Sequence, residues 1–243
     1  MADKTGVSWT NKTWNPWQGC QKVSDGCANC YMFREKKRYG QDPGKIIRSS
    51  QQTFNRPLKW NEPEKVFTCS WSDFFIKEAD PWRQEAWDII RKTPHITYQI
   101  LTKRPERVQN CLPDYWTELK NVWLGVTVEK QRHLERIIPI AQVRPNVLFI
   151  SVEPMLEAIS IFYGVHGILY GDVINSAHRV IDWVICGGES GPGYRKMELW
   201  WAENLKNQCE LSKIPFFMKQ VSGVTKKQCA KIPCNLAIQE FPE

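Results

Sequence analysis

The fold of this chain is decided by residues 96–152, ITYQILTKRPERVQNCLPDYWTELKNVWLGVTVEKQRHLERIIPIAQVRPNVLFISV. Three runs in it, ITYQILT, VWLGVTV and VLFISV, are rich in β-branched and aromatic residues and predict buried β-strands. The stretches between them, 104–119 and 131–143, show helical spacing of their apolar residues. Strands that alternate with helices indicate parallel strands joined by right-handed crossovers.

The same alternation extends in both directions along the chain. Further strands are predicted at 66–75, 181–186 and 214–218, and further helices at 82–91 and 199–211. This pattern suits an open doubly wound sheet or a (β/α) barrel. Polar residues follow nearly every predicted strand, and in a barrel those strand ends meet around one mouth. We therefore favour an α/β protein of the barrel type.

The chain shows no internal boundary between domains. It has no repeat, no low-complexity tract and no linker rich in Pro or Ser, so we expect one domain over residues 1–243. Residues 155–179 lack clean periodicity and predict an irregular connection.

Composition limits the class of protein. Of 243 residues, 42% are hydrophobic and 24% charged, which is typical of globular proteins. No apolar run reaches the roughly 20 residues that span a bilayer, and the N-terminal residues lack a leader pattern. We expect a cytoplasmic protein without membrane contact. The net charge of +7 favours an anionic partner such as nucleic acid, although a basic surface kept for solubility explains it equally well.

The chemistry is concentrated in residues 13–31, TWNPWQGCQKVSDGCANCY, where Cys20, Cys27 and Cys30 form a C-x6-C-x2-C array. Nine cysteines in a reducing compartment predict metal or redox chemistry. The Pro and Gly residues predict a turning loop, and three thiolates on such a loop can hold a [4Fe–4S] cluster with one iron left open. The alternatives are buried free thiols, or a zinc site that takes a fourth ligand from a distant histidine.

An open iron predicts a particular reaction. S-adenosylmethionine can chelate that iron, and one electron from the reduced cluster then releases a 5′-deoxyadenosyl radical. Two alternatives remain. One is a nucleic-acid-binding module with a structural metal site and no turnover, and the other is a cluster-bearing redox protein that does not cleave S-adenosylmethionine.

Two resemblances support the cluster hypothesis. The loop resembles the C-x3-C-x2-C loop that follows the first barrel strand in the radical SAM superfamily, although the first gap here is six residues. The runs TWNPWQGC, GCANCY, TKRPERV, WLGVTVE, SVEPM, WVICGGESGPGYR and IPFFMKQ together resemble an uncharacterised, radical-SAM-like phage and prophage family over nearly the whole chain. This resemblance implies a partial (β/α) barrel of about six or seven parallel strands, radical SAM type, with a [4Fe–4S] cluster and S-adenosylmethionine.

The strand-end residues are candidates for binding the cosubstrate. Carboxylates at a barrel mouth are costly unless they face a cation, such as the methionyl ammonium, or pair with a basic side chain. The Gly-rich turn after residue 186 either approaches the ligand closely or only makes a tight bend. The predicted contacts are Ser70, Asp73, Thr127, Glu129, Ser151, Glu153, Gly187, Gly188, Glu189 and Ser190, with Tyr31 from the cysteine loop.

A second group at the same strand ends is basic and predicts an anionic substrate. Its members are Lys103, Arg104, Arg195, Lys219 and Gln220. Aromatic residues near them in sequence either stack on unpaired bases or belong to the core; they are Trp14, Trp17, Tyr31, Trp71 and Tyr194. We therefore expect the substrate to be a nucleic acid base or a nucleotide, for modification or repair. A flavodoxin or ferredoxin is the expected electron donor.

The remaining cysteines and one basic run predict no site. Cys69, Cys111, Cys186, Cys209, Cys229 and Cys234 are scattered and are interpreted as structural thiols. The run from Arg34 to Arg38 is interpreted as a solvated helix face.

Overall fold

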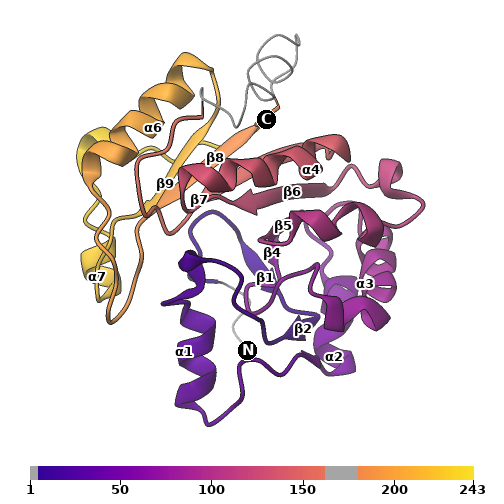
Figure 1. Ribbon diagram of the computed structural model, residues 1–243. Helices are drawn as coiled ribbons and strands as arrows, with labels where there is room; N and C mark the ends of the chain where they lie inside the picture. Colours follow the sequence, from indigo (N-terminus) through magenta and orange to yellow (C-terminus); the bar gives the residue numbers. More distant parts are fainter. Residues whose placement is uncertain (1–4, 162–179) are drawn as a thin grey trace.

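The architecture is that of an α/β protein built on one curled parallel sheet, seen in a computed structural model that describes residues 5–161 and 180–243 (Figure 1). The sheet contains, in spatial order, β1 (Lys12–Trp14), β4 (Lys65–Thr68), β5 (Thr97–Thr102), β6 (Val122–Thr127), β7 (Val147–Val152), β8 (Trp183–Gly187) and β9 (Phe216–Gln220). Each neighbouring pair is parallel. The strand order follows the chain without reversal, whereas a doubly wound sheet reverses at a switch point. The arrangement is consistent with a partial (β/α) barrel.

The predicted strands are confirmed except at the edge of the sheet where the chain begins. β1 was missed because three residues, KTW, are too few and too polar to register as an apolar run. The strand predicted at 66–75 ends at Thr68, because Cys69 has a φ of +62°, a left-handed conformation that ends the strand. Ser70 and Asp73 therefore lie on a loop and not on the strand.

The predicted helices are confirmed where no proline interrupts them. α3 (Asp80–Lys92) and α6 (Leu199–Leu211) match the predictions. The helix predicted at 104–119 is wrong, since only short 3-10 turns form between Pro105 and Glu118. The stretch 131–143 divides into a 3-10 segment and α4 (Ile137–Gln142), because Pro139 cannot donate to the carbonyl four residues before it. The remaining elements are α1 (Tyr31–Arg38), α2 (Gln51–Phe54), α7 (Lys226–Cys229) and the antiparallel pair β2 (Trp17–Gln18) and β3 (Ile47–Arg48).

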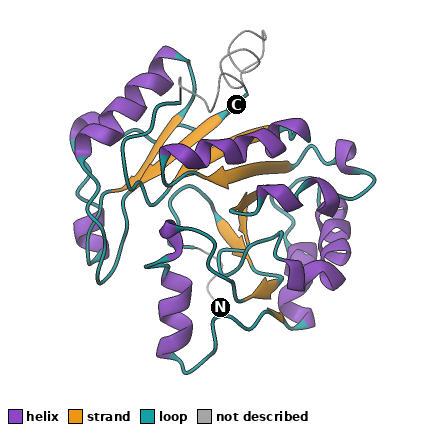
Figure 2. Ribbon diagram, in the orientation of Figure 1, coloured by secondary structure: helices purple, strands orange, loops and turns teal. Residues whose placement is uncertain are grey.

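Side chains alternate between two faces of the sheet, as the two-residue period of a strand requires. The outer face packs against α3, α4 and α6, which lie on one side of the strands (Figure 2). The inner face carries a separate cluster, made of Trp9, Trp123, Val147, Phe149, Trp183, Ile185 and Phe217. This inner cluster fills the base of the half-barrel and leaves room for a cavity above it, at the carboxyl ends of the strands.

The connection between β7 and β8 agrees with the prediction over the residues that the structure describes. The irregular connection is present as a loop from Met155 to Ile161, and residues 162–179 lie outside the described part. In residues 5–161 and 180–243, no helix is long and apolar enough to cross a membrane.

Candidate active site

The three-cysteine loop, residues 20–30, connects β2 to α1 and lies at the carboxyl ends of the parallel strands. All nine cysteines of the chain are free thiols. Cys27 is buried, whereas Cys20 and Cys30 are half-buried. The start of the loop is held by two backbone hydrogen bonds. The Gly19 amide donates to the Trp71 carbonyl (3.0 Å), and the Cys20 amide donates to the Pro43 carbonyl (2.9 Å).

Three strand ends hold this loop through side-chain hydrogen bonds, one beside each cysteine. The bonds join Arg104 Nη2 to the Gln21 carbonyl (2.9 Å), Ser24 Oγ to Glu129 Oε1 (2.6 Å) and Asn29 Nδ2 to Glu189 Oε2 (2.9 Å). Their partners follow β5, β6 and β8. Residues predicted from sequence as ligand contacts therefore position the loop.

Asp73 and Arg104 form a buried ion pair beside Cys20, with Nη1 and Oδ2 3.0 Å apart. Asp73 also accepts from Thr102 Oγ1 (2.8 Å) and from the Lys103 amide (3.0 Å). Arg104 Nη1 lies 3.8 Å from Cys20 Sγ. Burial and the charge of Asp73 raise the pKa of the Cys20 thiol to about 12, against the opposing charge of Arg104. Binding a metal at Cys20 would therefore release a proton.

Glu129 is the most buried carboxylate of the site, with a fully covered side chain. It pairs with Lys103 Nζ at 3.1 Å and Arg136 Nη1 at 2.7 Å, besides the bond from Ser24. Burial opposes its charge, but the two cations and the Ser24 hydroxyl outweigh burial and lower the pKa of Glu129 to about 2. Gly26 packs directly on this carboxylate, and a Cβ there would overlap with it. The glycine thus allows the loop to approach the strand end.

The other two acidic residues are also paired. Glu189 accepts from the Arg195 amide (2.7 Å) and from Arg195 Nε (3.0 Å). Burial opposes the charge of Glu189, but the bonds from Arg195 and Asn29 prevail and lower its pKa. Glu153 forms an ion pair with Lys219. Of the two interpretations left open by the sequence, the structure shows pairing with basic residues for all four carboxylates.

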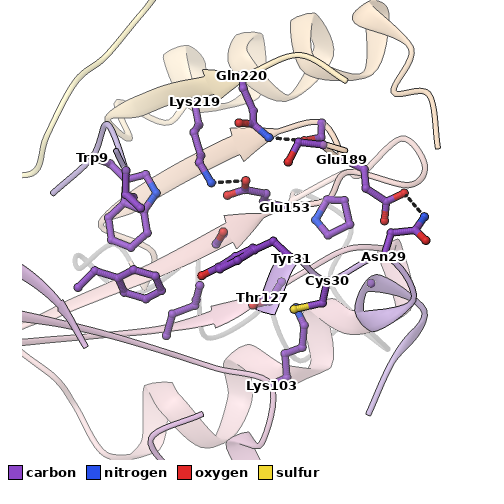
Figure 3. Close-up of a pocket in the computed structure, with 18 residues that line it drawn as sticks. Trp9, Asn29, Cys30, Tyr31, Lys103, Thr127, Glu153, Glu189, Lys219 and Gln220 are labelled. Atoms are coloured by element: carbon purple, nitrogen blue, oxygen red, sulfur yellow. Dashed lines mark hydrogen bonds and ion pairs between the residues drawn. The ribbon is translucent and has the colours of Figure 1, made fainter. Parts of the chain in front are cut away.

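A pocket of about 210 Å³ opens between the cysteine loop and the strand ends (Figure 3). The predicted site residues that line it are Cys30, Tyr31, Lys103, Thr127, Ser151, Glu153, Gly188, Glu189, Ser190, Lys219 and Gln220. The pocket lining does not include Cys20, Cys27, Ser70, Asp73, Arg104, Glu129, Gly187 or Arg195. Ser70 supports the pocket from outside, because its carbonyl accepts from the Tyr31 hydroxyl.

Sequence reasoning missed the inner wall of the pocket. Val7, Trp9, Phe67 and Leu101 form this apolar wall. Phe67 and Leu101 could have been found from strand alternation, because each precedes a polar strand-end residue on the opposite face. Nothing in the local sequence marks Val7 or Trp9, which reach the site only through the tertiary fold.

The predicted stacking aromatics differ in burial, and one of them, Trp71, is half-buried. Trp14 and Trp17 are fully buried in the outer core, so for these two residues the core interpretation is confirmed and base stacking is excluded. Tyr31 and Tyr194 are exposed, and Tyr31 lies in the pocket. The basic run on α1 is also not a wholly solvated face, because Lys36 is only 1% exposed.

The donor chemistry of the loop suits an iron–sulfur cluster, since three free thiols lie on one anchored loop and Cys30 faces the pocket. In the structure the three thiols are not arranged around a common metal position. In the described ranges, no set of three or more His, Cys, Asp or Glu side chains is placed to hold one ion. A cluster would require the thiols to converge within the loop. Of the other six cysteines, four are buried, namely Cys69, Cys186, Cys209 and Cys229. Cys69 lies near enough to Cys20 for the two thiols to interact electrostatically.

The fold and site together define an α/β protein with an open parallel half-barrel and a three-cysteine loop across its mouth. The chain belongs to the family described as proteins of unknown function, DUF5131, whose family model matches residues 4–240. Comparisons with curated proteins and with solved structures found no match.

Proposed function

We propose that this protein is a radical SAM enzyme in which Cys20, Cys27 and Cys30 hold a [4Fe–4S] cluster. The observation that carries the proposal is the fastening of a three-thiol loop to the ends of β5, β6 and β8, beside a pocket at the mouth of a parallel half-barrel. Barrel enzymes build their sites at this end. The resemblance to a radical-SAM-like phage and prophage family supports the same proposal.

Each part of the pocket has a role in this proposal. When bound and reduced, the cluster would supply the electron that cleaves S-adenosylmethionine to methionine and a 5′-deoxyadenosyl radical. Ser151, Glu153, Gly188 and Ser190 would contact the cosubstrate from the ends of β7 and β8. Glu189 would act mainly by holding Asn29 and Arg195, because its oxygens are already hydrogen-bonded to them.

A nucleic acid base or nucleotide is the proposed substrate, with modification or repair as the outcome. The net charge of +7 and the exposed ring of Tyr31 in the pocket support it. A flavodoxin or ferredoxin is the proposed electron donor. The rival proposals are a redox protein that keeps the cluster without cleaving S-adenosylmethionine, and a nucleic-acid-binding module with a structural metal.

The test is anaerobic reconstitution with iron and sulfide, reduction by dithionite, addition of S-adenosylmethionine and chromatography for 5′-deoxyadenosine. We expect the product from the natural chain. Replacing Cys20, Cys27 or Cys30 by Ala should remove most bound iron, because each thiolate supplies one of three protein bonds to the cluster.

Cys234→Ala is the matched control, since Cys234 is an exposed free thiol outside the loop. It should keep its iron and form the product. Full iron retention in all three loop variants would refute the cluster assignment. A cluster that forms without 5′-deoxyadenosine would favour the redox protein, and a colourless zinc protein would favour the structural metal.

A further inference from the structure

The inner wall of the pocket contains a hydrogen-bond donor, the Trp9 indole N–H, for which the described residues supply no acceptor. Trp9 is 2% exposed, and among the residues the structure describes its Nε1 has no hydrogen-bond partner. Figure 3 shows the indole nitrogen on the side of the ring that faces Lys219 and Glu153. An unpartnered buried N–H costs roughly 1–3 kcal/mol, so it is rarely retained without a use.

The surroundings of this donor are flat and apolar. Phe67 packs against Trp9 with ring centroids 4.6 Å apart, and Leu101 and Val7 complete the wall. Tyr31 lies across the middle of the pocket in Figure 3, and its hydroxyl is fixed to the Ser70 carbonyl. A fixed ring and an aromatic wall suit a planar ligand.

The charges at the mouth do not favour an anionic group. Lys103, Arg104, Arg195 and Lys219 are paired with Glu129, Asp73, Glu189 and Glu153. A phosphate would have to displace one of these carboxylates, and breaking a mostly buried pair leaves its partner uncompensated. The pocket is thus polar but electrically balanced, which suits an uncharged ligand.

The size of the cavity limits the ligand further. Its volume of about 210 Å³ is below the roughly 300–1,000 Å³ of sites that enclose a whole drug-sized ligand. One ring system fits within that volume, whereas a larger ligand such as the cosubstrate would extend beyond it toward the open mouth.

We infer that the pocket binds an uncharged, flat heteroaromatic ring of the nucleobase type, with a ring acceptor atom taking the hydrogen bond from Trp9 Nε1. Assigning this ring to the substrate rests on the proposed function. The binding itself does not depend on it, because the wall is formed by side chains of the chain alone.

The experiment compares two probes of the same shape, benzimidazole and indole, which differ by one ring nitrogen that accepts a hydrogen bond. Binding to the full-length protein without a cluster is followed by ligand-observed NMR titration at pH 7.5. Benzimidazole should bind about 2- to 10-fold more tightly than indole, the range expected for one neutral hydrogen bond. Inorganic phosphate should not displace it.

Trp9→Phe removes the donor and should abolish the preference for benzimidazole. Trp123→Phe is the matched control, because Trp123 belongs to the same inner aromatic cluster but does not line the pocket. It should keep the preference. Equal affinity of the two probes for the natural chain, which needs no variant to fold, would overturn the inference, and so would an unchanged preference in folded Trp9→Phe.

A final arm separates the substrate from the cosubstrate, which also carries a purine. With reconstituted protein saturated with S-adenosylmethionine, benzimidazole should still bind. Displacement would overturn the assignment to the substrate. The outcomes for this pocket and for the proposed function are distinct, because probe binding is measured without a cluster and 5′-deoxyadenosine formation without a probe.

Discussion

At the scale of single residues, the mouth of the half-barrel is made of acid–base pairs, three of which join different strand ends: Asp73–Arg104, Glu129–Lys103 and Glu153–Lys219. Glu129 pairs with two cations, Lys103 and Arg136, and also accepts from Ser24, on a side chain with no exposed surface. Removing one member of a buried pair is far more costly than removing an exposed one, since the remaining charge has neither water nor a counterion. The stability of the mouth therefore depends on this carboxylate.

Glu129→Gln should lower the free energy of unfolding by about 3–5 kcal/mol at pH 7, because it leaves Lys103 and Arg136 without their shared counterion. The amide oxygen can still accept from Ser24, so the loop contact is retained. Urea unfolding followed by tryptophan fluorescence measures the change. Glu118→Gln is the control, since its ion pair with Arg91 is exposed, and it should change stability by less than about 1 kcal/mol.

The effect of Glu129→Gln on stability should also depend on pH. The pKa of Glu129 is about 2 in the folded protein, below its ordinary value of 4.5, so its stabilisation is fully present above pH 4.5. It is lost as the pH falls toward 2. The difference in the free energy of unfolding between the natural chain and Glu129→Gln should therefore shrink between pH 4.5 and pH 2. A difference that stays constant from pH 7 to pH 2 would contradict the assigned pairing.

At the scale of elements, the three-cysteine loop has little regular structure of its own, with one short 3-10 turn at Asp25–Cys27. Its shape is set by bonds to the strand ends. Asn29 makes two of them, to Glu189 Oε2 (2.9 Å) and to the Gly193 carbonyl (2.8 Å). These bonds join the loop to the Gly-rich segment after β8, which lines the opposite side of the pocket.

Asn29→Ala should release the end of the loop while leaving the sheet intact. We expect faster hydrogen exchange in residues 24–31, a loss of about 1–3 kcal/mol in global stability, and a lower iron content after reconstitution. Hydrogen-exchange mass spectrometry and iron analysis measure these effects. Asn235→Ala removes a comparable exposed bond to Glu203 and should leave the loop unchanged. Unaltered exchange in Asn29→Ala would show that the loop does not need this anchor.

At the scale of the whole molecule, an open half-barrel has edges that must be covered. The C-terminal segment covers β9: the Met218 amide donates to the Ile238 carbonyl (2.8 Å) and the Glu240 amide to the Phe216 carbonyl (3.0 Å). Phe241 also packs on Trp183 of the inner cluster with ring centroids 5.3 Å apart. The segment therefore completes both the edge and the base of the half-barrel.

Deleting residues 238–243 should expose the β9 edge and leave the Trp183 indole without its acceptor, the Glu240 carbonyl (2.8 Å). We expect the free energy of unfolding to fall by about 3–5 kcal/mol, which lowers the Tm by about 6–20 °C. We also expect the shortened molecules to associate through the open edge of β9. Thermal unfolding and size-exclusion chromatography test this. Deleting residues 242–243 alone should have little effect, and a six-residue deletion with an unchanged Tm would exclude this role.

Local patterns in the sequence determined much of the architecture. The alternation of apolar runs with helical stretches predicted six of the seven strands of the parallel sheet, since burial on both faces requires such runs. The Pro and Gly residues around Cys20, Cys27 and Cys30 likewise predicted a turning loop that carries three thiols. Prediction failed where proline or a left-handed residue acted against the apolar pattern, as at Pro139 and Cys69.

Only the tertiary structure decided what the polar residues do. Ser24 and Glu129 are 105 positions apart and Asn29 and Glu189 160 apart, so no local pattern relates them. Trp9 likewise reaches the pocket from outside the sheet. Whether a residue forms part of a strand or a turn is determined largely by its neighbours in the sequence. The pairing of a charge depends instead on which strand ends converge, and that is settled when the sheet curls.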